Sequence, residues 1–278
     1  FGRNIMSSDT ARGKPVKSYD ALDVAVALLK RREGIDKTLK LVRYASIFAA
    51  SEAKDAFGAD SPFVASATAL EKSIGNARRA LRLGKFLGNV QDLRDELRDA
   101  QSRGVSVLKR WTSAAAACAL LEGAYYFLEQ GVWLSKAGVA MREKTTLDRL
   151  VRWSARAEVM SYVFSVSLSL DEARACAVAR RRHERALSME LSRDAHDVDS
   201  DAVDTLRSSI ARERIEWRRA VLAIVQDATD AVLSFEDALD VPGVELSHER
   251  FVNALGLLAA ALDFHGKLTS AIESLDDE

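Results

Sequence analysis

A cluster of cations between Leu70 and Asn89 is the part of this sequence best suited to chemistry. The segment reads LEKSIGNARRALRLGKFLGN, and no acidic residue occurs between Glu71 and Asp92. At helical spacing, apolar residues fall on one side and lysine and arginine on the other. Such a helix suits an anionic membrane surface, where each cation contributes about 1 kcal/mol. The residues predicted to bind membrane lipids are Lys72, Arg78, Arg79, Leu81, Arg82, Leu83, Lys85 and Leu87.

The same segment has a structural alternative. Surface helices of soluble proteins also place cations outside and leucine inside. The lack of acids favours the membrane, because soluble helices usually mix charge signs along the exposed face. Phe86 lies off the apolar face, where it could deepen insertion or contact another helix.

Residues that could support catalysis or bind metals are scattered along the rest of the chain. No histidine pairs with a cysteine or another histidine at metal-ligand spacing; the four are His183, His196, His248 and His265. Glu122 and Glu129 are expected to face a polar side rather than to form an acid pair. Common nucleotide-binding and hydrolase motifs do not occur. We therefore predict a protein that is not an enzyme and that has no metal and no cofactor.

The composition predicts an all-α protein. There are 40 Lys and Arg against 41 Asp and Glu, so the chain has no overall positive charge that would indicate nucleic acid as a partner. The only three prolines, Pro15, Pro62 and Pro242, lie in expected loops, which leaves room for long helices. We expect a bundle of long antiparallel helices with one amphipathic, membrane-facing helix. Cys118 and Cys176 read as small buried residues rather than a disulfide.

The helices expected from apolar periodicity are 19–32, 35–56, a helix through 70–101, 105–142, 145–171, 217–239 and 249–275. Ser61 is a candidate N-cap. No stretch qualifies cleanly as a transmembrane helix. Residues 1–19 read as a flexible arm before one helical domain, residues 20–278, with a charged insert at about 171–219. That insert is either a long solvated helix with a loop near 194–201 or partly disordered.

Glycine and aromatic residues gather within the 105–142 segment. Glycine inside a helix costs about 1 kcal/mol relative to alanine, so its presence here indicates close helix packing or a break. The residues predicted to pack against other helices are Gly123, Gly131, Trp133 and Gly138. Whether these neighbours would be protein or membrane-embedded helices is open. The first residue is Phe1, which predicts a fragment or a processed product.

Three segments in order resemble the peroxin eleven family of peroxisomal membrane elongation proteins. They are Glu33–Lys37 with Leu41–Ser46, Ala77–Asn89, and Tyr125 followed by Gly131–Gly138. The second is similar to the family pattern ARKxFRLGKFLN. In the first, Ile35 and Arg43 replace an arginine and a glutamine of the family pattern.

The resemblance implies a non-enzymatic protein of the peroxisomal membrane that elongates and divides the organelle. Its implied partners are anionic membrane lipids, further copies of itself, and a dynamin-related GTPase with its tail-anchored adaptor. The alternative is a scaffold subunit of a large mitochondrial or plastid membrane complex, in which the same cations would face acidic protein or lipid headgroups.

Overall fold

The computed structural model describes residues 20–140, 143–192, 199–239 and 249–276. These residues form helices and no strand, which confirms the all-α prediction. The helices are α1 (Ala21–Leu29), α2 (Arg32–Phe57), α3 (Pro62–Leu81), α4 (Phe86–Ser102), α5 (Val107–Trp111), α6 (Ala114–Lys136), α7 (Lys144–Leu191), α8 (Ser200–Ala238) and α9 (Glu249–Asp276).

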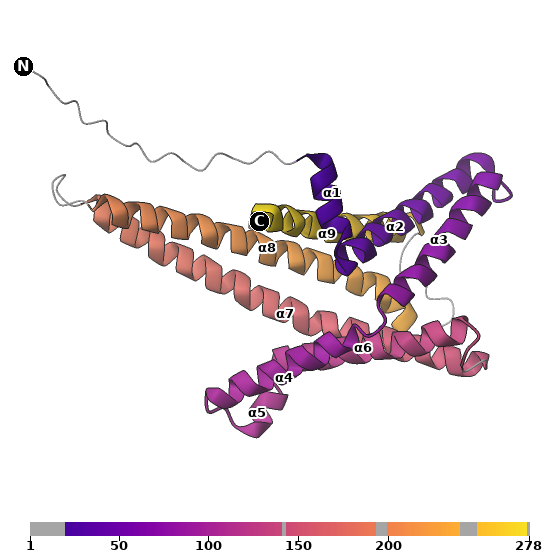
Figure 1. Cartoon of the computed structure of the whole chain (residues 1–278), viewed down its shortest axis with the longest axis horizontal. Coiled ribbons are helices and arrows are strands. Elements are labelled where there is room, and N and C mark those ends of the chain that lie inside the picture. The colour runs from indigo at the N-terminus through magenta and orange to yellow at the C-terminus, as the bar shows by residue number, and fades with distance from the viewer. Residues whose placement is uncertain (1–19, 141–142, 193–198, 240–248, 277–278) are drawn as a thin grey trace, which may run out of the picture.

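The two longest helices, α7 and α8, run side by side and form the long axis of the molecule (Figure 1). Helix α6 packs on α7, and α4 packs on α6. On the other side, α9 packs against both α8 and α2. Helix α2 in turn packs against α3. The short turn from α3 to α4 therefore crosses from the α2–α9 side of the molecule to the α6–α7 side.

The described part of the charged segment 171–219 is helical except for Ser192 and Asp199. Its two parts lie in the second half of α7 and the first half of α8. The alternative of a long helix with a loop near 194–201 agrees with this arrangement, although residues 193–198 lie outside the described part of the chain. The predicted arm, residues 1–19, also lies outside it.

Two predicted helices are interrupted in the structure. The helix expected through 70–101 breaks after Leu81, and α4 begins at Phe86. Between them Gly84 adopts a φ of 74°, a conformation that glycine reaches without the steric cost that a Cβ imposes. The helix expected over residues 105–142 is also broken, because Ser113 caps α6 by accepting a hydrogen bond from the Ala116 amide. Ser61 does occupy the N-cap position of α3.

The glycines predicted to pack against other helices, in α6 and just after it, differ in what surrounds them. A Cβ on Gly123 would lie 3.2 Å from the Asn89 Cβ of α4, and one on Gly131 would lie 3.4 Å from Leu150 of α7. Gly138 has no such neighbour; its φ of 75° ends the helix. Trp133 is half-buried. Cys118 and Cys176 are both unpaired thiols. Cys176 is buried as predicted, and Cys118 is half-buried.

No helix in the described part of the chain combines the length and the apolar character needed to cross a membrane. The exposed large apolar side chains are instead spread over several helices.

Candidate functional site

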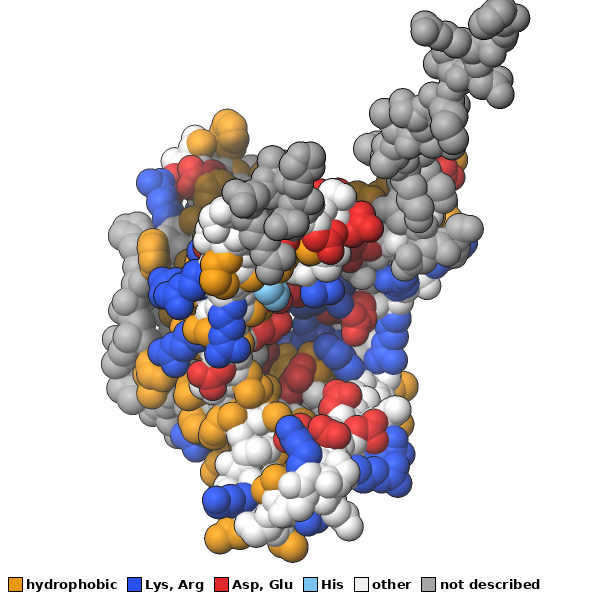
Figure 2. All heavy atoms as spheres, turned by 90° about the vertical axis from the view of Figure 1, so that its left-hand side faces the viewer, with side chains coloured by type: hydrophobic (Ala, Val, Ile, Leu, Met, Phe, Trp, Pro, Cys, Tyr) orange, Lys and Arg blue, Asp and Glu red, His pale blue; other side chains and the backbone are white. Residues whose placement is uncertain are grey.

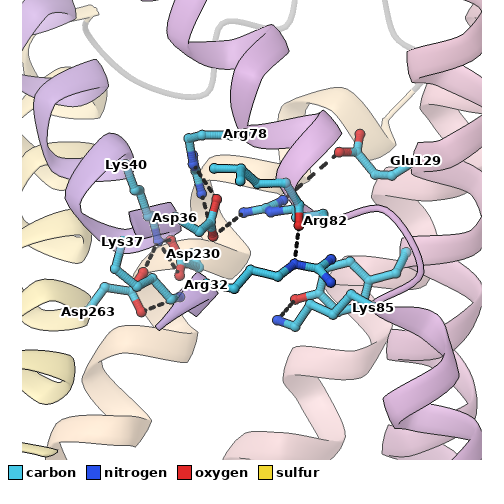
Figure 3. A network of polar contacts seen from close by, with 12 residues as sticks. Arg32, Asp36, Lys37, Lys40, Arg78, Arg82, Lys85, Glu129, Asp230 and Asp263 are labelled. Atoms are coloured by element: carbon cyan, nitrogen blue, oxygen red, sulfur yellow. Dashed lines mark hydrogen bonds and ion pairs between the residues drawn. The ribbon is translucent and has the colours of Figure 1, made fainter. Parts of the chain in front are cut away.

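The three segments that resemble the peroxin eleven family are called the signature segments below. A buried ion pair joins the first two of them. Asp36 of α2 accepts hydrogen bonds from Arg78 of α3, with distances of 2.9 Å from Nε and 3.4 Å from Nη2 (Figure 3). Arg82 adds a third contact at 3.5 Å. Burial alone would raise the pKa of Asp36, but the Arg82 and Arg78 charges outweigh it and hold this pKa well below its usual range. Asp36 therefore stays ionised at neutral pH.

The third signature segment completes the same network from α6. Arg82 donates to the Tyr125 hydroxyl at 2.8 Å and lies 3.9 Å from Glu129, while Arg79 lies 3.6 Å from Glu129. Lys85 donates to the Tyr126 hydroxyl at 2.5 Å. Its ammonium also lies 4.2 Å from the centre of the Tyr126 ring, in cation–π geometry.

Glu129 faces these cations, with its side chain 13% exposed, and so lies on a polar side as predicted. Glu122 accepts a hydrogen bond from Asn89 of α4 at 2.9 Å.

A second ion cluster ties α2 to α8 and α9. The Lys40 ammonium lies 2.8 Å from both carboxylate oxygens of Asp230 and 2.5 Å from Asp263. Lys37, one turn earlier on α2, bonds the other oxygen of Asp263 at 2.6 Å. Burial raises the pKa of Asp263, but Lys37 and Lys40 bring it below its ordinary value. Three helices that are far apart in sequence therefore meet at two lysines of α2.

The turn between α3 and α4 is fixed on both sides. Arg32 of α2 donates to the backbone carbonyls of Leu81 and Leu83, where α3 leaves its last carbonyls without helical partners. On the other side Phe86 meets Phe127 edge-on, with ring centroids 5.5 Å apart. Of the two roles left open for Phe86, contact with another helix is the one observed.

The predicted membrane-binding residues separate into two groups. Arg78 is buried, and Arg79, Arg82 and Lys85 are half-buried and engaged with α2 or α6. The prediction that these cations line the outer face of one helix is wrong, since carboxylates and tyrosines of the same chain hold them. The remaining members lie nearer the surface: Lys72, Leu83 and Leu87 are exposed, and Leu81 is half-buried.

Sequence reasoning missed the acidic partners in α8 and α9. Asp263 stands alone among apolar residues of a long helix, a position in which an unpaired charge would be costly. That isolation is the signal by which Asp263 could have been found, whereas Asp230 lies one turn after Asp227 and has no such signal. No group of side chains able to hold a metal ion occurs in the described residues.

A further carboxylate, half-buried, lies on α7. Glu158 accepts hydrogen bonds from the Tyr162 hydroxyl at 3.2 Å and the Ser234 hydroxyl at 2.8 Å. Burial raises its pKa, and the hydrogen bond from Ser234 offsets this only in part. Cys118 lies in the same region, where burial raises the thiol pKa to about 11, so the thiol is not a ready nucleophile. The cluster is thus built to hold helices together rather than to react.

We expect Glu158→Gln to stabilise the protein at pH 7. The raised pKa means that folding penalises the charged carboxylate, and glutamine keeps the shape without the charge. The gain should shrink as the pH falls through the folded-state pKa, because Glu158 then becomes neutral itself. Urea unfolding at pH 7 and pH 5 tests this. Equal or lower stability of the variant at pH 7 would contradict the assignment of a destabilising charge.

Comparison with known proteins agrees with the three signature segments that meet in this network. The sequence matches the family described as Peroxisomal biogenesis factor 11 over residues 22–266. It is 36% identical to Peroxisomal membrane protein 11-3 of Oryza sativa subsp. japonica, over 86% of this chain and 85% of that protein. It is 30% identical to Peroxisomal membrane protein 11A of Arabidopsis thaliana, over 90% and 93% of the two chains. No solved structure gives a significant match. The resemblance predicted from the sequence is confirmed, and the chain belongs to the Peroxisomal biogenesis factor 11 family.

Proposed function

We propose that this protein shapes and elongates the peroxisomal membrane by inserting the apolar side of its α3–α4 turn into one leaflet. Membership of a family of peroxisomal biogenesis factors supports a role in forming the organelle. Relatives that are named peroxisomal membrane proteins support that membrane as its location, as the sequence predicted. The same membership favours this function over a scaffold subunit of a mitochondrial or plastid complex.

The observation that carries the proposal is the exposure of two leucines at the turn. Leu83 is 56% exposed and Leu87 is 61% exposed, although Lys85 between them points inward to Tyr126. Val90 and Phe127 add exposed apolar area on α4 and α6. Exposed apolar side chains on this turn and on the helices beside it are suited to contact with a membrane or a partner.

The insertion we propose differs from the one expected from the sequence. The inward-facing cations hold the turn in place, and the leucines enter the headgroup boundary. Area added to one leaflet favours curvature of the membrane. Lys72 is exposed on α3, the helix before the turn, and supplies attraction to anionic lipids.

We expect the double variant Leu83→Asp, Leu87→Asp to lose binding to vesicles of phosphatidylcholine and phosphatidylserine by at least about tenfold. Burying a leucine side chain is worth about 1.5–3 kcal/mol, and both contributions would be lost. Vesicle flotation of the full chain measures this. Met189→Asp, Leu191→Asp is the matched control, since both residues are more than half exposed at the far end of α7. Unchanged binding of the first variant would contradict insertion by this turn.

The proposal also includes self-association of the protein, which would multiply the effect of each inserted turn. It further includes recruitment of a dynamin-related GTPase through its tail-anchored adaptor. Both rest on the family resemblance, and neither depends on the cleft described next.

A further inference from the structure

A cleft of about 860 Å³ opens between α2, the α3–α4 turn, α8 and α9. Figure 2 shows one face of the molecule hollowed, with lysine and arginine side chains around the hollow. The volume lies within the range of about 300–1,000 Å³ that is usual for small-molecule sites. The first two signature segments supply residues to one wall of this cleft, and helices α8 and α9 supply the other.

The cleft is positively charged although the chain as a whole is not. Seven of its lining side chains are Lys or Arg and four are Asp or Glu, an excess of three positive charges, whereas the chain carries a net charge of −1. Arg218 of α8 is exposed and has no partner among the described residues. Its neighbour Arg219 forms exposed ion pairs with Glu216 and Glu273, and such exposed pairs are weak in water.

At the inner end of the cleft Lys37 is paired with Asp263, but Lys85 has no carboxylate partner among the described residues. The ammonium of Lys85 bonds a neutral tyrosine hydroxyl rather than a carboxylate. Burial has the largest effect on Lys85 and, with the charges of Lys37 and Arg82, holds the pKa of Lys85 below its ordinary value, although the charges of Glu122 and Glu33 oppose it. A bound anion would relieve this repulsion, so the inner end of the cleft is suited to a negatively charged group.

The wall formed by α8 and α9 is partly apolar. Leu222, Ala223 and Leu262 line it beside the cations. A ligand that fits both features carries a multivalent anion and an attached apolar or aromatic part. Arginine is the side chain best matched to phosphate oxygens, since its planar guanidinium presents several donors.

We propose that this cleft binds a phosphate ester, either a free organic phosphate or the headgroup of a phospholipid. The phosphate would lie among Lys37, Lys85 and Arg218, and the remainder of the ligand would lie against the α8–α9 wall. This site differs from the α3–α4 leucines, and its occupancy does not require membrane insertion.

Calorimetric titration of the full chain tests the proposal with three probes: inorganic pyrophosphate, soluble dihexanoyl phosphatidylinositol 4-phosphate, and citrate as a carboxylate of similar charge. Binding of pyrophosphate supports a free phosphate, and binding of the short-chain lipid alone supports a headgroup. Binding of citrate as tight as that of either phosphate probe would overturn the assignment to phosphate. Failure of both phosphate probes to bind would overturn the site.

Charge reversal locates the binding in the cleft. We expect Arg218→Glu, Arg219→Glu to weaken phosphate binding by at least about tenfold, as for the loss of a close charge pair. The control Arg212→Glu, Arg214→Glu makes the same charge change on exposed residues of α8 that do not line the cleft, and should bind as the unmodified chain does. Equal effects of the two variants would overturn the location. Vesicle flotation of both variants separates this result from the proposed membrane function, which depends on Leu83 and Leu87.

Discussion

Replacing Arg78 with alanine should destabilise the protein by about 3–5 kcal/mol, the range typical for removing one partner of a buried ion pair. Arg78 is 6% exposed and Asp36 is 8% exposed, so water cannot take over the lost hydrogen bonds. Arg82 reaches Asp36 only at 3.5 Å and cannot replace the contact at 2.9 Å. Urea unfolding at pH 7, followed by circular dichroism, measures the effect.

The Arg78 result has a matched control and a pH test. Arg79→Ala removes a neighbouring cation whose ion pair is longer and more exposed, and should cost no more than about 1 kcal/mol. Because the folded-state pKa of Asp36 is depressed, its contribution is present above its ordinary pKa of 3.8 and is lost as the pH falls through the folded value. The difference between the unmodified chain and Arg78→Ala should therefore shrink in acid.

A double variant shows whether the uncompensated charge is the cause. Asp36→Asn, Arg78→Ala should be more stable than Arg78→Ala alone, since it removes the carboxylate that has lost its partner. If Arg78→Ala unfolds with the free energy of the unmodified chain, Arg78 is not held as described and would be available to lipid headgroups.

Replacing Lys40 with methionine should cost a similar amount, about 3–5 kcal/mol. The Lys40 ammonium is the contact that joins Asp230 to Asp263, and Asp230 has no other ion pair among the described residues. Methionine fills the space of the lysine stem but leaves the Asp230 carboxylate buried without a counter-charge. We also expect faster amide hydrogen exchange in α9, because one of the contacts that holds it to α2 and α8 is lost.

The pH dependence of stability separates the charge of Lys40 from its packing. Asp230 and Asp263 outweigh burial and raise the pKa of Lys40 above 10.5, so its contribution is lost only as the pH rises through that higher value.

Lys37→Met is the control for Lys40→Met. It makes the same change one turn away on α2, yet Asp263 keeps its bond to Lys40 at 2.5 Å. A smaller loss of stability is therefore expected. Equal losses from the two substitutions would show that Lys40 has no special position between the carboxylates.

Several features of the fold followed from local sequence alone. Ser61 and Pro62 mark the start of α3, where a capping residue precedes the one helical position that tolerates proline. The absence of proline between them and Pro242 allowed the long helices α7 and α8. The helix breaks near Gly84 and Ser113 were missed, because apolar periodicity runs across them and a turn of this kind depends on what packs on either side.

The sequence by itself determined the all-α class, the family and the segment in which the cations gather, since helix propensity, motif order and charge are local properties. Only the tertiary structure decided what those cations face. The partner of Arg78 is 42 residues away on another helix, and that of Lys40 is 190 residues away. A helical projection tells which residues share a side, but it cannot tell whether water, lipid or a buried carboxylate covers that side. For Arg78 and Arg82 it is the carboxylate, and Leu83 and Leu87 are left as the exposed residues of the same turn.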